Sequence, residues 1–318
     1  MKTKFVFRVS VVLFCFFLEA GWISAAQAQE IPSDYQQVLN YLGRPGDFKA
    51  GVLKINVPRN DIRVTVTGVP MPTAFGFGGW VALTKGAGGK DVMMGDLVLE
   101  QEKVNPVMSA LLEHGLEATA LHNHFFWEEP RLFYMHIHGY GEPMDLARRL
   151  KPALELIGRP PAAGTSAPAS PTTNPAAQMK LDTAKISQIA GHPGETSGSV
   201  YKITVGRDDL GMKEMGAAIN ARMGLNSWAA FVGADEQAAV AGDIAMLEAE
   251  IQPVLRTLLK QGLTVVAIHH HMTGVRPAVI FLHYWGQGPV DKLAAGFRAA
   301  LDELGKARGL HTAHRSLR

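Results

Sequence analysis

A segment with closely spaced histidines occurs twice in this chain, and this repetition is the strongest constraint on its fold. Residues 120–141 read ALHNHFFWEEPRLFYMHIHGYG and residues 267–288 read AIHHHMTGVRPAVIFLHYWGQG, so the same frame returns 147 positions later. Eight of the twelve histidines lie in these two segments, and three coincide without a gap: His122 with His269, His124 with His271, and His136 with His283. The chain is therefore expected to build one local structure twice.

The duplication extends well beyond the histidines. Further matches, in the same order, are Lys54 with Lys202, Arg59 with Arg207, Asp61 with Asp209, Trp80 with Trp228 and, after a one-residue slip, Gly95-Asp96 with Gly242-Asp243. A segment rich in Pro, Ala, Ser and Thr separates the copies and lacks the apolar periodicity that burial needs. We therefore predict five segments: a signal peptide at 1–28, a first repeat at 31–158, a linker at 159–180, a second repeat at 181–306 and a basic tail at 307–318.

The first residues are typical of a secretory signal peptide. Basic residues precede the apolar stretch Val11–Leu18, and Ala26-Gln27-Ala28 is a small-x-small cleavage site. We expect a periplasmic or secreted protein, cleaved near Ala28. The single cysteine, Cys15, lies inside this segment, so the mature chain would have no thiol for a disulfide or a thiolate metal site.

Charge and hydropathy exclude two classes of partner. The full chain carries +2, and the first 28 residues hold three Lys/Arg and one Glu, so cleavage leaves about zero. A near-neutral chain lacks the basic footprint of a nucleic-acid-binding protein. No later run approaches the roughly 18 apolar residues of a membrane span.

The pattern of apolar residues predicts the same elements in each repeat. In the first we expect helices at 33–42, 103–114 and 143–157 and strands at 51–57, 62–68, 79–84, 92–99, 117–124 and 131–138. The second copy differs at 211–223, where the spacing of Met212, Met215, Ala218 and Ile219 favours a helix. The fold class is α+β: two tandem homologous copies, each a mostly antiparallel sheet with helices on one face. Because each sheet has a second face to cover, we expect the copies to pack face to face with pseudo-two-fold symmetry.

Strand alternation points His122 and His124 to the same side of their strand, and His136 and His138 to the same side of theirs. Imidazole suits Zn or another divalent transition metal, and three histidines with an open fourth position are typical of catalytic zinc. The candidate metal ligands are His122, His124, His136, His138, Glu128, His269, His271 and His283. The candidate ligand-binding aromatics are Trp127, Tyr134 and Trp285.

The register of the histidine strands decides whether these side chains meet. If residues 125–130 form the hairpin loop, His124 lies opposite Arg131 and His122 opposite Phe133, which leaves His136 about 10 Å further along. A wider loop or a bulge would bring His124 opposite His136. Both registers are compatible with the sequence.

Other residues duplicated in both copies have structural interpretations. Arg59 with Asp61, and their second-copy counterparts, are expected to form internal salt bridges that close a turn. Trp80 and Trp228 are expected to be core anchors.

The whole pattern resembles the LppY/LpqO family of bacterial exported proteins, in which an uncharacterised domain occurs as tandem copies. The resemblance spans essentially the mature chain and is most specific at His122-Asn123-His124 and His136-Ile137-His138-Gly139. It implies duplication and export, and no activity comes with it. Members that are mycobacterial lipoproteins carry a lipobox, which this chain does not show, so the resemblance does not imply membrane anchoring here.

Three functions remain open from the sequence. The protein binds a transition metal, and could be a metal-dependent hydrolase. Alternatively, it is a non-enzymatic module that binds a small ligand or acts in the cell envelope. In the third interpretation, the histidines only satisfy backbone groups. In each case the two repeats are expected to pack on each other within the chain.

Overall fold

The computed structural model describes residues 29–157 and 180–306 of the 318-residue chain. The expected signal peptide, almost all of the linker and the basic tail lie outside these residues. All of the predicted second repeat, and the first repeat except residue 158, lie within the described residues.

The first repeat contains three helices and nine strands. Its helices are α1 (Ser33–Leu42), α2 (Val104–Glu113) and α3 (Pro143–Leu156). Its strands are β1 (Gly46–Lys49), β2 (Val52–Pro58), β3 (Val64–Val66), β4 (Val69–Met71), β5 (Gly78–Lys85), β6 (Asp91–Glu100), β7 (Glu117–His122), β8 (Glu128–Glu129) and β9 (Leu132–Gly141).

The second repeat has the corresponding order of elements. Its helices are α4 (Thr183–Ala190), α5 (Glu248–Lys260) and α6 (Val290–Leu301). Its strands are β10 (Gly194–Ser197), β11 (Val200–Gly206), β12 (Lys213–Glu214), β13 (Ala217–Ala218), β14 (Asn226–Ala234), β15 (Gln237–Leu247), β16 (Thr264–His270) and β17 (Val279–Gly288).

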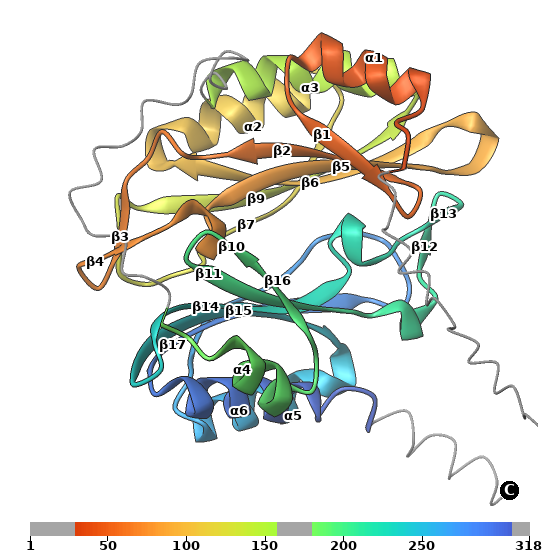
Figure 1. Cartoon of the computed structure of the whole chain (residues 1–318). Coiled ribbons are helices and arrows are strands. Elements are labelled where there is room, and N and C mark those ends of the chain that lie inside the picture. The colour runs from red at the N-terminus through yellow and green to blue at the C-terminus, as the bar shows by residue number, and fades with distance from the viewer. Residues whose placement is uncertain (1–28, 158–179, 307–318) are drawn as a thin grey trace, which may run out of the picture.

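Each repeat forms a six-stranded antiparallel sheet with the same strand order. The order is β1-β2-β5-β6-β9-β7 in the first and β10-β11-β14-β15-β17-β16 in the second. The sheets lie face to face in the middle of the molecule, and each repeat's helices cover the outer face of its own sheet (Figure 1). The predicted α+β class and the two tandem copies with helices on one face are confirmed.

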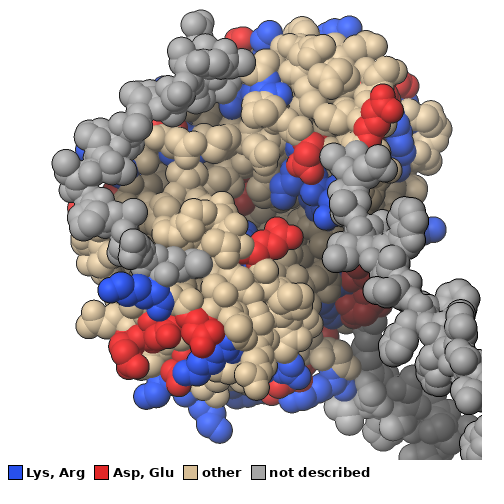
Figure 2. All heavy atoms as spheres, in the orientation of Figure 1, with Lys and Arg blue, Asp and Glu red and all other residues tan. Residues whose placement is uncertain are grey.

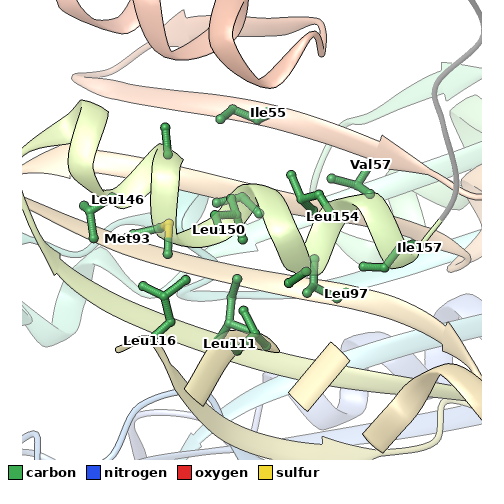
Figure 3. Close-up of a cluster of buried hydrophobic side chains, with 14 of the residues drawn as sticks. Ile55, Val57, Met93, Leu97, Leu111, Leu116, Leu146, Leu150, Leu154 and Ile157 are labelled. Atoms are coloured by element: carbon green, nitrogen blue, oxygen red, sulfur yellow. The ribbon is translucent and has the colours of Figure 1, made fainter. Parts of the chain in front are cut away.

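In each repeat, the helices pack an apolar stripe against the outer face of the sheet, and the side chains on that face are apolar as well. In the first repeat, Leu146, Leu150 and Leu154 of α3 recur at helical spacing and point toward the sheet (Figure 3). Gly139 allows this close approach: a Cβ there would lie 3.0 Å from Leu146 of α3. Its counterpart Gly286 has the same role, because a Cβ there would lie 3.2 Å from Leu293 of α6.

The inner faces pack against each other, so residues from both repeats share two buried clusters. One contains Phe75, Phe125 and Tyr134 with Val200 and Trp285 of the second repeat. Polar contacts cross the same interface: the Thr119 hydroxyl donates to the carbonyl of His271 at 2.7 Å, and Arg222 pairs with Asp47 at 2.6 Å. The two repeats therefore form one packed body.

The helix predicted at 211–223 is wrong. This segment forms the two-stranded hairpin β12–β13, between short 3-10 turns at 208–210 and 221–223. Gly211, Gly216 and Gly224 take positive φ angles, which a continuous helix cannot accommodate. Met212 and Ile219, which suggested the helix, are instead buried against the first repeat's inner face.

The predicted salt bridges of the duplicated arginines are confirmed. Arg59 pairs with Asp61 at 2.9 Å and Arg207 with Asp209 at 3.0 Å. Each guanidinium also bonds a glutamate and a backbone carbonyl of β6 or β15. These contacts connect the end of β2 or β11 to a central strand of the same sheet.

The exterior shows no dominant sign of charge. Basic and acidic side chains are interspersed on the face seen in Figure 2. None of the helices in the described ranges has the length and apolar character needed to cross a bilayer.

Candidate metal centre between the two repeats

The histidines lie on the inner faces of the two sheets, where a β-bulge sets their direction. The register of β7 against β9 shifts between Ala118 and Ala120, so that His122 lies opposite Tyr134. The same shift occurs between Val265 and Ala267 in the second copy. Cross-strand partners share a face, so the bulge turns His122 toward the same side as His136.

The observed register is neither of the two that the sequence left open. The first of them placed residues 125–130 in the hairpin loop. It paired His122 with Phe133, whereas β7 ends at His122, opposite Tyr134, and His124 lies beyond its end. Residues 128–129 leave the hairpin altogether and pair with β3. His136 lies opposite Ala120 and Asp96 instead of opposite His124.

Six histidines, three from each repeat, meet where the inner faces touch. The rings of His122 and His269 stack on each other with centroids 3.7 Å apart. The next two ring contacts between histidines of the two repeats have nearly equal lengths: His124 to His283 is 3.8 Å and His136 to His271 is 3.9 Å between centroids. This equality is what a pseudo-two-fold axis between His122 and His269 produces.

The axis relates two sets of three histidines, each drawn from both repeats. One set is His122, His124 and His283, whose ligand nitrogens lie within 4.8 Å of one another. Its symmetry counterpart, His269, His271 and His136, has matching ring distances, but it is not among the groups of described residues whose ligand nitrogens all lie within 4.8 Å. Two other groups meet the same 4.8 Å limit: His122 with His136 and His269, and Asp243 with His269 and His271.

All six histidines are buried, and most of their ring nitrogens have no partner. None is more than 8% exposed. In His122, His269 and His271, neither ring nitrogen has a hydrogen bond within the described part of the chain. In His124 and His283 one nitrogen, Nδ1, lies 3.2 Å from the carbonyl oxygens of Gly76 and Gly242, respectively, and Nε2 is unpartnered. A ring that donates through Nδ1 presents the lone pair of Nε2, which is the usual arrangement of a metal-ligating histidine.

Burial keeps these imidazoles neutral at physiological pH. Loss of hydration is the largest cause that lowers the pKa of all six rings, and neighbouring imidazoles lower it further. For His269 the pKa falls to about 3. Neutral imidazole is the form that coordinates a metal ion.

Aromatic rings and carboxyl groups surround the histidines. Tyr134 stacks on His124 with centroids 3.3 Å apart, and Phe281 stacks on His271 at 3.4 Å. Asp96 lies beside His136 in the register of the first sheet, as Asp243 lies beside His283 in the second. Burial raises the pKa of Asp96 to about 7 and that of Asp243 to about 8.

The remaining candidate ligands lie outside the histidine sets. His138 forms an ion pair with Glu214 of the second repeat at 3.0 Å. Glu128 is buried in the small sheet with β3, where one of its oxygens accepts a hydrogen bond from the backbone of Leu132. Among the described residues, neither joins a group whose ligand atoms converge within 4.8 Å.

Of the three candidate ligand-binding aromatics, one lies beside the histidines and two do not. Tyr134 lies directly against the centre, as described above. Trp127 is 54% exposed on the loop before β8, next to Phe126. Trp285 packs into the shared core against Phe75 and Phe125, which leaves it no open face to offer a ligand.

Sequence reasoning missed the two aspartates as part of the site. Asp96 and Asp243 were recognised only as matching positions of the duplication. The available signal was that each aspartate occupies an inward-facing position of an otherwise apolar central strand. A carboxylate is buried there only where a partner or a functional role offsets the cost of burial.

The sequence matches a family described as Domain of Unknown Function (DUF1259), once over residues 36–156 and again over residues 184–303. The chain belongs to this family. Both DUF1259 segments contain the three histidines of their copy, so the centre between the repeats is built from two copies of one domain. No curated protein matches the sequence significantly.

Comparison with solved structures finds bacterial microcompartment shell proteins at very low similarity to this DUF1259 protein. A trimeric shell protein, PduB, has 9% identity and a TM-score of 0.22, over 84% of this chain and 93% of that chain. EtuB from Clostridium kluyveri has 6% identity and a TM-score of 0.20, over 80% and 88%. Scores this low assign no shared role.

Proposed function

We propose that this protein binds a divalent transition-metal ion between its two repeats. The ligands are the two symmetric sets, His122 with His124 and His283, and His269 with His271 and His136. The observation that carries the proposal is a cluster of six buried, neutral imidazoles. Each has at least one ring nitrogen without a hydrogen bond in the described part of the chain, and the nitrogens of His122, His124 and His283 converge within 4.8 Å.

The ligand type limits which ions fit. Imidazole nitrogen suits Zn, Cu, Ni or Fe, whereas Mg and Ca prefer cages of oxygen ligands. Three imidazoles leave one position of a tetrahedral ion open, and Asp243 lies close enough to His269 and His271 to complete one set. A single ion per chain would be bound by residues of both sets, whereas two ions would occupy one set each.

A purely structural role for the histidines explains less. Nδ1 of His124 and Nδ1 of His283 do bond backbone carbonyls, but every one of the six rings still has at least one buried nitrogen without a hydrogen bond in the described part of the chain. Each unpartnered buried polar group costs about 1–3 kcal/mol. An apolar core would avoid that cost, whereas coordination of an ion would offset it.

A small-ligand module built on the aromatics has weaker support. Of Trp127, Tyr134 and Trp285, only Tyr134 lies beside the histidines. The open coordination position favours instead a second candidate, metal-dependent hydrolysis. Ester and phosphate hydrolysis by the metal-loaded protein tests that candidate, and its absence would leave metal binding as the function.

Metal analysis of the full chain tests the main proposal. The protein is stripped with a chelator, incubated separately with Zn, Cu, Ni and Fe, desalted and analysed by mass spectrometry for bound metal. We expect one or two equivalents of at least one ion to remain per chain. Retention of less than about 0.1 equivalent of every ion would refute the proposal.

A further inference from the structure

The two halves of the centre differ in which ligand atoms converge. Of the three groups of described residues whose ligand atoms lie within 4.8 Å of one another, two have no residue in common. The imidazole group consists of His122, His124 and His283. The mixed group consists of Asp243, His269 and His271. An ion in one of these groups therefore leaves every ligand of the other group available.

Asp243 is held with one carboxylate oxygen toward the histidines. Its Oδ1 accepts a hydrogen bond from the backbone N–H of Leu282 at 2.9 Å, and its Oδ2 lies 3.9 Å from Nε2 of His271. That separation is too long for a hydrogen bond, and Nε2 of His271 has none within the described part of the chain. Two ligands about 2.1 Å from one ion lie roughly 3–3.5 Å apart, so a small shift would bring both atoms to a shared ion. A hydrogen bond that orients the carboxylate is typical of a metal ligand.

Asp96, the counterpart of Asp243 in the first repeat, forms no such group. Its Oδ1 is buried without a hydrogen bond from any described residue, and it joins none of the convergent groups found in residues 29–157 and 180–306. The rings that stack on the histidines differ as well. Tyr134 stacks on His124, whereas Phe281 stacks on His271. The pseudo-two-fold axis therefore relates the two halves in fold but not in ligand chemistry.

The two sets of ligand atoms suit different ions. Three imidazoles suit Zn or Cu. Two histidines with one carboxylate form the ligand set of non-haem Fe(II) sites, in which further coordination positions stay open. The carboxylate of Asp243 also supplies a negative charge to a buried cation, which neutral imidazoles do not.

We propose that the centre holds two unlike ions, with Zn or Cu in the imidazole group and Fe(II) in the mixed group. This inference rests on the proposed function, because it assigns ions to two parts of the same centre. The mixed group binds its ion more weakly, since it has one imidazole fewer. It also depends on the first repeat: the ring of His122 stacks on His269 at 3.7 Å, and the Thr119 hydroxyl donates to the carbonyl of His271 at 2.7 Å.

Anaerobic metal loading of the full chain tests the difference between the groups. Stripped protein receives one equivalent of Zn and is then dialysed to equilibrium against Fe(II), and both metals are measured by mass spectrometry. We expect about one Zn and one Fe(II) per chain. Asp243→Asn keeps the shape of the side chain and an acceptor for the N–H of Leu282. It should weaken Fe(II) binding at least about tenfold at unchanged Zn content.

The matched control is Asp96→Asn, which makes the same change at the corresponding buried position of the first repeat. It should keep the wild-type affinity for both ions, and thermal melts verify that both variants are folded. Equal Fe(II) affinity in Asp243→Asn and the wild type, or equal losses in the two aspartate variants, would overturn the inference. Loss of Zn together with Fe(II) from folded Asp243→Asn would also overturn it.

The same measurement separates this inference from the proposed function. A wild-type chain that holds Zn but no Fe(II) would overturn the second site and leave metal binding as the function. A wild-type chain that holds neither ion, nor any other transition metal, would refute both.

Discussion

Replacing His122 and His269 together with alanine is expected to remove essentially all tightly held metal. These two rings stack on the pseudo-two-fold axis, and each belongs to one of the two ligand sets. Each set would keep two imidazoles, too few for a closed site. Because changes in the outer shell alone cost 10–100-fold in affinity, we expect a loss of at least about 100-fold. Bound metal after desalting should fall below about 0.1 equivalent.

The control for this variant removes the same number of histidines elsewhere. His114→Ala/His192→Ala takes one histidine from each repeat outside the two sets, and it should retain the full metal content. A thermal melt of both variants separates loss of ligands from loss of folding. Wild-type metal content in His122→Ala/His269→Ala would contradict the assignment of the ligands.

Replacing Arg207 with methionine is expected to lower the free energy of unfolding by about 3–5 kcal/mol. Its guanidinium is buried and bonds the Ala245 carbonyl at 2.6 Å and Glu250 at 3.0 Å. The Glu250 side chain is 0% exposed, so the variant leaves a buried carboxylate without its counter-charge. Chemical denaturation monitored by circular dichroism measures the change.

The duplication supplies an internal control for this prediction. Arg59, the counterpart of Arg207, bonds Glu100 and Asp61, whose side chains are 31% and 54% exposed. Water can solvate both carboxylates after Arg59→Met, so this variant should lose clearly less stability. Equal losses at the two positions would mean that exposure of the partner carboxylate does not determine the cost.

Most of the fold could be predicted because the two copies support each other. The alternation of apolar residues predicts the strands β2, β5, β6 and β9, and the helical spacing of Leu146 and Leu150 predicts the helix α3. The failure at 211–223 has a physical cause: Met212 and Ile219 are apolar because they contact the other repeat. Such a contact is invisible to local periodicity.

The site was predicted only in part, for a similar reason. Strand alternation grouped His122 with His124 and His136 with His138, but a bulge sets the register between the two strands, and local sequence does not encode a bulge strongly. The decisive feature is that each set borrows a histidine from the other repeat. That depends on how two sheets face each other, which no motif within one copy can reveal.

The aspartates show how the missing part of the site could have been found. Asp96 and Asp243 match between the copies and lie on inward-facing positions of strands. His138 and Glu128, in contrast, have no counterpart of the same type in the second copy, where Trp285 and Val275 stand. Both lie outside the centre. A polar residue that is the same in both copies was therefore a better indicator of the site than a residue that lies close to the histidine motif.

The most direct test of a centre shared between the repeats is metal binding by the variant His122→Ala/His124→Ala/His136→Ala, measured by competitive titration against a chromogenic chelator. This variant removes every histidine that the first repeat contributes and leaves His269, His271 and His283 intact. The shared arrangement predicts loss of tight binding, because the two convergent groups that span the repeats each lose two imidazoles and only His269, His271 and Asp243 remain together. Retention of one equivalent at wild-type affinity would show that the second repeat binds metal alone and would contradict the account.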